Sequence, residues 1–403
     1  MKLKISNRKM ETGKCLQASA GKFHLSNTGK CVLQVHRLRL TAFIISLTAL
    51  SFIALLPAQT KAQGGIAAYS DYKDAFMVFD RGTFQQLDYL KVRSFKPGGN
   101  TLAYVDNKGE FQIYYNGKKY HQLYSTDMFS YFNTNYLVAY KVASVLYVFE
   151  KGKSEKISYY CNQYFVGDSL IAYYDDSNYN LSVFYNGVNR PIESSLLASP
   201  QTVHIGSNTL AYVNQSGYFK IFYHGELTDV DVTTPISFEA GRDIVAYVDG
   251  YQKYFHLFYK GKIAQVDVNI PETYKVGFGN MAYVDYDGNF RVFSNGATRR
   301  LLSQRPDFFE VKGNMIIYGY NSEFRTFANG ESQLIDDIMP KEYKLSNDGV
   351  AYLDVNGMLK FYSKGKLNMV SHEAVTKYFI YNDVVLYLLG TNTWKVWWNG
   401  TSY

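Results

Sequence analysis

The stretch that decides the fold is LAYVDNKGEFQIYYNGK, residues 102–118, because it returns in altered form along most of the chain. The clearest other copies are IAYYDDSNYNLSVFYNGV (171–188), LAYVNQSGYFKIFYHGE (210–226), VAYVDGYQKYFHLFYKGK (245–262), MAYVDYDGNFRVFSNGA (281–297) and VAYLDVNGMLKFYSKGK (350–366). Each copy closes on a glycine, and these glycines recur about every 35 residues: Gly82, Gly117, Gly152, Gly187, Gly225, Gly261, Gly296, Gly330, Gly365 and Gly400. Regular self-similarity of this kind indicates internal duplication into ten units.

Each unit is predicted to consist of short β-strands. The hydrophobic-Ala-Tyr run and the aromatic run after it are strands, and Asp-x-x-Gly between them is turn chemistry, as at Asp106–Gly109. An Asn-Gly or Lys-Gly turn then leads into a polar third strand, and a fourth strand leads to the next unit. The aromatic content of 17% also favours an all-β chain, since Tyr and Phe suit the pleated surface of sheets.

The first two strands of a unit are almost continuously apolar, which predicts that both faces of each sheet are covered. A β-propeller provides this environment, because each blade lies between two neighbours. The fourth-type strand occurs nine times and the hairpin ten times, so we expect the tenth unit to close against the first and protect both edges. We therefore predict one ring of ten repeats over residues 63–403, with two smaller propellers or fewer, larger blades as alternatives.

The Asp-x-x-Gly hairpin followed by an aromatic strand resembles the WD40-like repeat of TolB-type propellers. The resemblance covers about 15 residues of each unit, and it implies a propeller fold. This chain lacks the Ser-Pro-Asp-Gly opening turn of that family, so the resemblance implies no TolB-like role.

Residues 1–62 have the composition of a targeting segment. A basic region precedes the apolar run 40–56, and small residues follow up to Ala62, which is typical of a secretory signal peptide. An uncleaved anchor or a downstream start is the alternative, and membrane contact is expected only through an uncleaved leader. The segment also holds ten of the 42 Lys and Arg and one of the 35 acidic residues, so residues 63–403 are close to neutral, which argues against nucleic-acid binding.

Several polar residues are candidate sites. Asp285, Asp287 and Asn289 have the close oxygen spacing of a calcium loop, but only one copy of the repeat has the full spacing, so turn capping is the preferred interpretation. Asp231, Asp267 and Asp336 share one register of the repeat, and with Asp106 and Asp354 they are candidates for a binding surface; the alternative is a solvated strand edge. No catalytic motif, cofactor fingerprint in the right context or histidine metal spacing is recognised, and no cofactor is expected.

The repeated tyrosines of the hydrophobic-Ala-Tyr run are expected in the core, between blades. Lone Cys161 is expected to be a small buried hydrophobic residue. Together these features predict an exported, non-catalytic propeller in the periplasm, at the cell surface or outside the cell. A protein is the expected partner. A glycan-binding, lectin-like propeller and a glycan-active hydrolase with paired carboxylates at the channel mouth are the alternatives.

Overall fold

The computed structural model describes residues 64–194, 202–328 and 330–403, so the predicted targeting segment, residues 1–62, lies outside the described residues. The regular elements of the described part are the strands β1 to β38, which pair as a series of small antiparallel sheets. Within these residues, no helix has the length and apolar character needed to cross a membrane. The predicted all-β class is confirmed.

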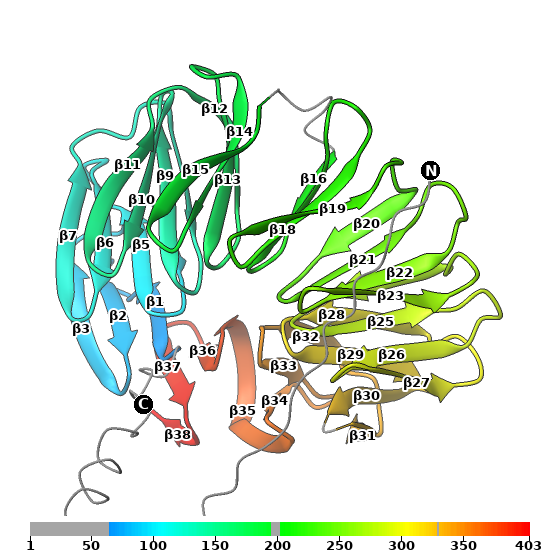
Figure 1. The fold of residues 1–403 in the computed structure, drawn as a ribbon. Helices are drawn as coiled ribbons and strands as arrows, with labels where there is room; N and C mark the ends of the chain where they lie inside the picture. The colour runs from blue at the N-terminus through cyan, green and yellow to red at the C-terminus, as the bar shows by residue number, and fades with distance from the viewer. Residues whose placement is uncertain (1–63, 195–201, 329) are drawn as a thin grey trace, which may run out of the picture. The chain divides into compact units, whose positions relative to one another are not determined.

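The sheets follow one another along the chain as ten blades, arranged as a ring (Figure 1). We name the strands of a blade inner, second, third and outer, in chain order. Blade 1 has three strands, which correspond to the second, third and outer strands of the other blades: β1 (Ile66–Ser70), β2 (Phe76–Asp80) and β3 (Thr83–Asp88). Blade 2 consists of β4 (Ser94–Pro97), β5 (Thr101–Val105), β6 (Phe111–Tyr115) and β7 (Lys118–Leu123). Blade 3 consists of β8 (Phe129–Asn133), β9 (Leu137–Val142), β10 (Val145–Glu150) and β11 (Lys153–Ser158).

The next four blades repeat this order. Blade 4 consists of β12 (Cys161–Val166), β13 (Leu170–Asp175), β14 (Asn180–Tyr185) and β15 (Val188–Glu193). Blade 5 consists of β16 (Val203–Ile205), β17 (Thr209–Val213), β18 (Phe219–Tyr223) and β19 (Glu226–Asp231). Blade 6 consists of β20 (Ser237–Ala240), β21 (Ile244–Val248), β22 (Phe255–Tyr259) and β23 (Lys262–Asp267). Blade 7 consists of β24 (Thr273–Val276), β25 (Asn280–Val284), β26 (Phe290–Ser294) and β27 (Ala297–Leu302).

Of the last three blades, blades 9 and 10 share a strand. Blade 8 consists of β28 (Phe308–Lys312), β29 (Met315–Tyr320), β30 (Glu323–Ala328) and β31 (Glu331–Asp336). Blade 9 begins with β32 (Glu342–Leu345), β33 (Gly349–Leu353) and β34 (Met358–Ser363). The long strand β35 (Lys366–Tyr381) pairs with β34 through its first part and with β36 (Val384–Leu389) through its second. It is therefore both the outer strand of blade 9 and the inner strand of blade 10, which ends in β37 (Thr393–Trp398) and β38 (Thr401–Ser402).

Turn chemistry explains why the strands stop where they do. In blade 2 the Asp106 carboxylate accepts the Glu110 N–H at 2.9 Å, and Gly109 supplies the positive φ of +93° that the turn requires. Asn116 and Gly117 both have positive φ, as a tight type I′ hairpin turn requires.

The repeated tyrosines are buried between blades, as predicted. Tyr104 of the second strand in blade 2 is 1% exposed, and its ring lies 5.2 Å from that of Phe76 in blade 1. The equivalent tyrosines of the later blades are equally buried: Tyr140, Tyr173, Tyr212, Tyr247, Tyr283, Tyr318, Tyr352 and Tyr387. Stability therefore comes from aromatic packing repeated around the ring, in a chain whose one described cysteine, Cys161, is free and buried.

The ring closes by contact between blades 10 and 1. The Gly65 N–H donates to the Asp383 carboxylate at 2.9 Å, and the rings of Phe79 and Tyr403 lie 5.1 Å apart. Ala67 and Phe79 of blade 1 share a hydrophobic cluster with Leu386 of blade 10. Closure of the first and last units was predicted, and the ring of ten blades is found rather than two smaller propellers or fewer, larger blades.

The antiparallel order gives the ring two different ends. The turns from inner to second strand and from third to outer strand lie at one end, which we call the turn face. The second-to-third turns and the connections between blades lie at the other end, the loop face. Contacts such as Thr234 Oγ1 to the Gly217 carbonyl, 3.1 Å, join a connection to a neighbouring second-to-third turn. The connections between blades therefore share a side with the Asp-x-x-Gly turns.

Candidate functional site

The inner ends of the blades form a continuous polar ring on the turn face. We call this ring the collar: it consists of Gly64–Gly65 and residues 98–100, 134–136, 167–169, 206–208, 241–243, 277–279, 313–314, 346–348 and 382–383. Backbone hydrogen bonds join neighbouring collar turns, for example Gly64 N–H to the Gly99 carbonyl at 2.8 Å and Phe278 N–H to the Gly313 carbonyl at 2.7 Å. Several neighbouring blades are thus held together by main-chain bonds as well as by their cores.

Glycine is required where these turns touch. A Cβ atom on Gly206 would lie 2.0 Å from the carbonyl oxygen of Gly241, and one on Gly241 would lie 2.1 Å from that of Gly277. Both contacts are with backbone, which has no rotamer to adjust. The close approach of successive turns explains why Gly recurs at this register of the repeat.

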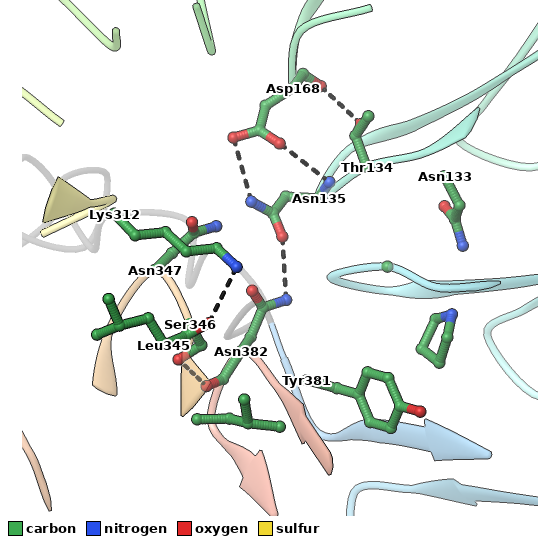
Figure 2. A pocket seen from close by; sticks show the side chains of 13 residues that line it. Asn133, Thr134, Asn135, Asp168, Lys312, Leu345, Ser346, Asn347, Tyr381 and Asn382 are labelled. Carbon is green, nitrogen blue, oxygen red and sulfur yellow. Dashed lines mark hydrogen bonds between the residues drawn. The ribbon is translucent and has the colours of Figure 1, made fainter. Parts of the chain in front are cut away.

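A cavity of about 290 Å³ opens between collar turns from opposite sides of the ring (Figure 2). Its lining includes Asn135 and Asp168 from blades 3 and 4, and Lys312, Asn347 and Asn382 from blades 8, 9 and 10. These five side chains are amides, a carboxylate and an ammonium group, and Leu345, Ile380 and Tyr381 add apolar surface, so the cavity suits a small molecule with both polar and apolar groups.

Hydrogen bonds cross this cavity. Asn382 donates from Nδ2 to Oδ1 of Asn135 at 3.0 Å, and Asn135 donates from its N–H and its Nδ2 to the Asp168 carboxylate at 3.2 and 3.1 Å. The same carboxylate accepts from Ser207 Oγ at 2.6 Å and from the Arg242 guanidinium at 3.1 Å. The Asp168 carboxylate thus links blade 4 to blades 3, 5 and 6, and Asn135 extends the link to blade 10, so the carboxylate acts as a structural acceptor.

The family match agrees with this architecture: residues 59–403 match the family described as the 10-bladed beta propeller domain. The chain belongs to this ten-bladed propeller family. No curated protein matches the chain. Among solved structures it is similar to the CRINKLY WD40 ectodomain of the Arabidopsis thaliana receptor kinase ACR4, with 8% identity over 59% of this chain and 98% of that one, at a TM-score of 0.30.

Two further solved structures show similarity of the same extent. Prp20p from Saccharomyces cerevisiae matches with 10% identity over 50% of this chain and 72% of its own, at a TM-score of 0.29. PorZ of Porphyromonas gingivalis, a surface component of its type-IX secretion system, matches with 8% identity over 77% of this chain and 51% of its own, at a TM-score of 0.27. At these scores the similarity supports no inference about function, so the site has to be interpreted from this propeller's own residues.

The inner strands add charged groups at the inner edges of the blades. The Lys96 ammonium donates to the Tyr131 carbonyl of the next inner strand at 2.7 Å, and Lys344 bonds the Tyr378 carbonyl at 2.8 Å in the same way. Burial lowers the pKa of Lys96, and burial raises the pKa of the Glu239 carboxyl. These side chains satisfy the unpaired backbone groups at the inner edge of the blades.

The predicted calcium-loop residues lie in the second-to-third turn of blade 7. The Asp285 carboxylate accepts from the Asp287 and Asn289 N–H groups at 3.1 and 2.8 Å, and from Arg291 Nε at 2.5 Å. Burial alone would raise its pKa, but the bonds from Arg291 and Asn289 outweigh burial and lower it. Among the described residues no group of three or more His, Cys, Asp or Glu side chains is placed to hold a metal ion. Asp285 therefore serves as a turn cap.

The remaining candidates also accept bonds from their own turns on the loop face. Asp106 and Asp354 cap equivalent turns of blades 2 and 9, with N–H donors at 2.9 Å. Asp231, Asp267 and Asp336 end the outer strands of blades 5, 6 and 8, and each accepts a backbone N–H from the residue two positions on. Asp106, Asp231 and Asp267 lie in separate blades, one to a blade, and no pair among them forms a shared site.

Asp336 and Asp354 are brought together, by a lysine that the sequence analysis missed. Lys360 Nζ lies 2.9 Å from Asp336 and 3.4 Å from Asp354, and the Tyr352 hydroxyl donates to Asp336 at 2.9 Å. Burial would raise the pKa of Asp336, but the bonds from Lys360 and Tyr352 outweigh it, so the pKa is lowered. This carboxylate thus ties the outer strand of blade 8 to blade 9.

The loop face exposes large apolar and aromatic side chains. Tyr89, Tyr124 and Tyr251 are 85%, 84% and 83% exposed, in contrast to the repeated tyrosines of the second strands, which are buried between blades. The other exposed side chains at this end are Tyr72, Leu90, Met128, Tyr159, Tyr160, Tyr179, Tyr218, Val232, Ile236, Val268, Ile270, Tyr286, Ile338 and Val355. They are spread over most blades, so the loop face exposes apolar and aromatic side chains around much of the ring.

Sequence reasoning missed Asp168, Arg242 and the exposed loop tyrosines as a set. A signal was present for the first two: charged residues stand in the collar turns GDS (167–169) and GRD (241–243), whereas GSN (206–208) and GFG (277–279) have none at those places. A charged residue at a position that is uncharged in other repeats can indicate a contact that occurs in one place only. Asp168 and Arg242 form such a contact with each other.

Proposed function

We propose that this propeller is an exported, non-catalytic binding or scaffolding module that engages a protein partner through its loop face. The observation that carries the proposal is the set of tyrosines exposed on that face. Tyr offers a large contact area at low cost in side-chain entropy and is enriched at the energetic centres of protein interfaces. A surface of this kind on a soluble ring is typical of an interaction site.

The other features support binding rather than chemistry. The carboxylates that were candidates for a surface site cap turns or bond neighbouring blades, and Asp168 is held by Asn135, Ser207 and Arg242. Export and localisation in the periplasm, at the cell surface or outside follow from the leader's composition and form part of the proposal.

The test compares capture from the native envelope by two variants. Tyr89, Tyr124 and Tyr251 changed together to Ser should lower recovery of the partner about tenfold or more, since exposed aromatic anchors contribute about 1–2 kcal/mol each. Val188→Ser is the matched control, because Val188 is 58% exposed and lies at a third-to-outer turn on the other face. Equal recovery by the triple variant and the wild type would refute the loop-face proposal.

A glycan-binding module is the second candidate, favoured by the amide-lined cavity of the collar. Asn side chains pair donor and acceptor groups as sugar hydroxyls do. Binding to a glycan array that is unchanged in the triple tyrosine variant but lost in Asn382→Ala would favour this function over protein binding.

A further inference from the structure

The turn face carries the opposite charge from the loop face. Exposed cations stand at or just after the third-to-outer turns: Lys118, Lys119, Lys151, Lys153, Arg190, Lys260, Lys262, Arg299, Arg300, Lys364 and Lys366. Fewer acids accompany them: Glu150, which pairs with Lys151 at 2.8 Å, and Glu155, Glu226, Asp229 and Glu331. This rim of the ring is therefore strongly basic.

The loop face compensates for the basic rim. Its exposed acids are Asp74, Asp127, Asp176, Glu272, Asp287, Asp307, Asp337 and Glu373, in addition to the partly buried turn-capping aspartates. Its cations are fewer: Lys73, Lys91, Arg93, Lys108, Lys253, Arg305 and Lys341. Residues 63–403 are close to neutral as a whole because the basic side chains of the turn face are balanced by the acidic side chains of the loop face. The two signs of charge are therefore concentrated at opposite ends of the ring.

We propose that the basic turn face binds the surface of a bilayer that contains anionic lipid headgroups. Cations at a membrane surface attract anionic lipids, and several of them acting together give stable but salt-sensitive binding. The third-to-outer turns of all blades end on the same side, so a flat charged surface meets the basic turns at the same time. Ile263 and Leu367 follow Lys262 and Lys366 directly and are 44% and 41% exposed, which adds apolar contact beside the charges.

The spacing of the charges favours a flat surface over a linear polyanion. Basic turns occupy blades 2, 3 and 4 and then blades 6, 7 and 9, and the run is interrupted by Glu226 in blade 5 and Glu331 in blade 8. A linear chain that followed the rim would meet an acid at each interruption, whereas a flat surface reaches the basic turns on both sides of it. The inference is independent of the proposed function, because it concerns the opposite face and leaves the loop face free for a partner.

The experiment uses the full chain with vesicles of phosphatidylcholine alone or mixed with phosphatidylglycerol. An amine-reactive label read out by peptide mass should show Lys118, Lys153, Lys262 and Lys366 protected by the mixed vesicles and not by the neutral ones. Lys108, Lys253 and Lys341 on the loop face are the internal controls and should stay labelled. This local readout separates the turn face from any contribution of residues 1–62, which are common to every sample.

A charge variant measures the strength of the contact. Changing Lys118, Lys153, Lys262 and Lys366 to Gln should weaken binding to mixed vesicles by at least about tenfold, since each surface cation contributes about 1 kcal/mol. Matched replacement of Lys108, Lys253 and Lys341 should leave binding unchanged. The proposal is overturned by equal protection on both faces, by unchanged binding of the turn-face variant, or by protection of the turn-face lysines with heparin but not with mixed vesicles.

Discussion

The turn face and the loop face are built from the same ten repeats and yet differ in almost every physical property. The collar turns contact each other through backbone and glycine, so their residues are fixed by close packing. The second-to-third turns and the connections between blades expose Tyr, Val and Ile to solvent instead. The comparison teaches that the repeated glycines of the collar encode close packing at one end of the ring, whereas the exposed apolar side chains at the other end differ from blade to blade.

The same contrast separates two classes of polar residue. On the collar, Asp168 and Arg242 make contacts that occur once and that join blades distant in sequence. On the loop face, Asp106, Asp285 and Asp354 each cap the turn of their own blade. The collar contacts join different blades, whereas each loop-face cap bonds within its own turn. Substitutions on the two faces should therefore lower the free energy of unfolding by very different amounts.

The largest effect is expected for Gly206→Ala in the collar. The added methyl group would lie 2.0 Å from the Gly241 carbonyl, so two blades have to separate. We therefore expect the free energy of unfolding to fall by about 3 kcal/mol. Gly357→Ala is the matched control: its φ is +79° but no atom lies within 4 Å of the new Cβ, so about 1 kcal/mol is expected. Urea unfolding followed by Tyr fluorescence measures both, and equal losses would contradict close packing at the collar.

An intermediate and pH-dependent effect on the free energy of unfolding is expected at Asp336, where blade 8 contacts blade 9. The pKa of Asp336 is lowered in the folded protein by Lys360 and Tyr352, so its carboxylate stabilises the fold above its unfolded pKa of about 3.9. This stabilisation is lost as the pH falls through the lower, folded pKa. Asp336→Asn should therefore cost about 1–2 kcal/mol at neutral pH and progressively less below about pH 4.

Unfolding measured from neutral pH to about pH 2 tests this dependence. Asp267→Asn is the control, because Asp267 occupies the same register in blade 6 and its carboxylate accepts the Asn269 N–H. A constant difference between Asp336→Asn and wild type across the acid range would show that the carboxylate's charge contributes nothing to the seam.

Much of the fold was predictable from the sequence, because each repeat makes the same local choices. The buried position of Tyr104 followed from its recurrence at one strand position, and closure of the ring followed from the count of strand types. The cavity was not predictable, since Asn135, Asp168 and Asn382 belong to different repeats and meet only when ten blades set the width of the ring. Asp336 was assigned to a surface because its pairing with Lys360 depends on how one blade packs against the next.

The smallest effect on stability is expected for Tyr124→Ser on the loop face. Tyr124 is 84% exposed, and its ring contacts the ring of His121, 4.1 Å between centroids, in its own blade. This side chain buries little apolar area in the folded protein, so its removal should change the free energy of unfolding by less than about 0.5 kcal/mol. The same substitution should weaken capture of the partner, and this separation of stability from binding is what distinguishes an interaction surface from a packing surface. A loss of stability as large as that of Gly206→Ala would show that the loop face, like the collar, serves to hold the ring together.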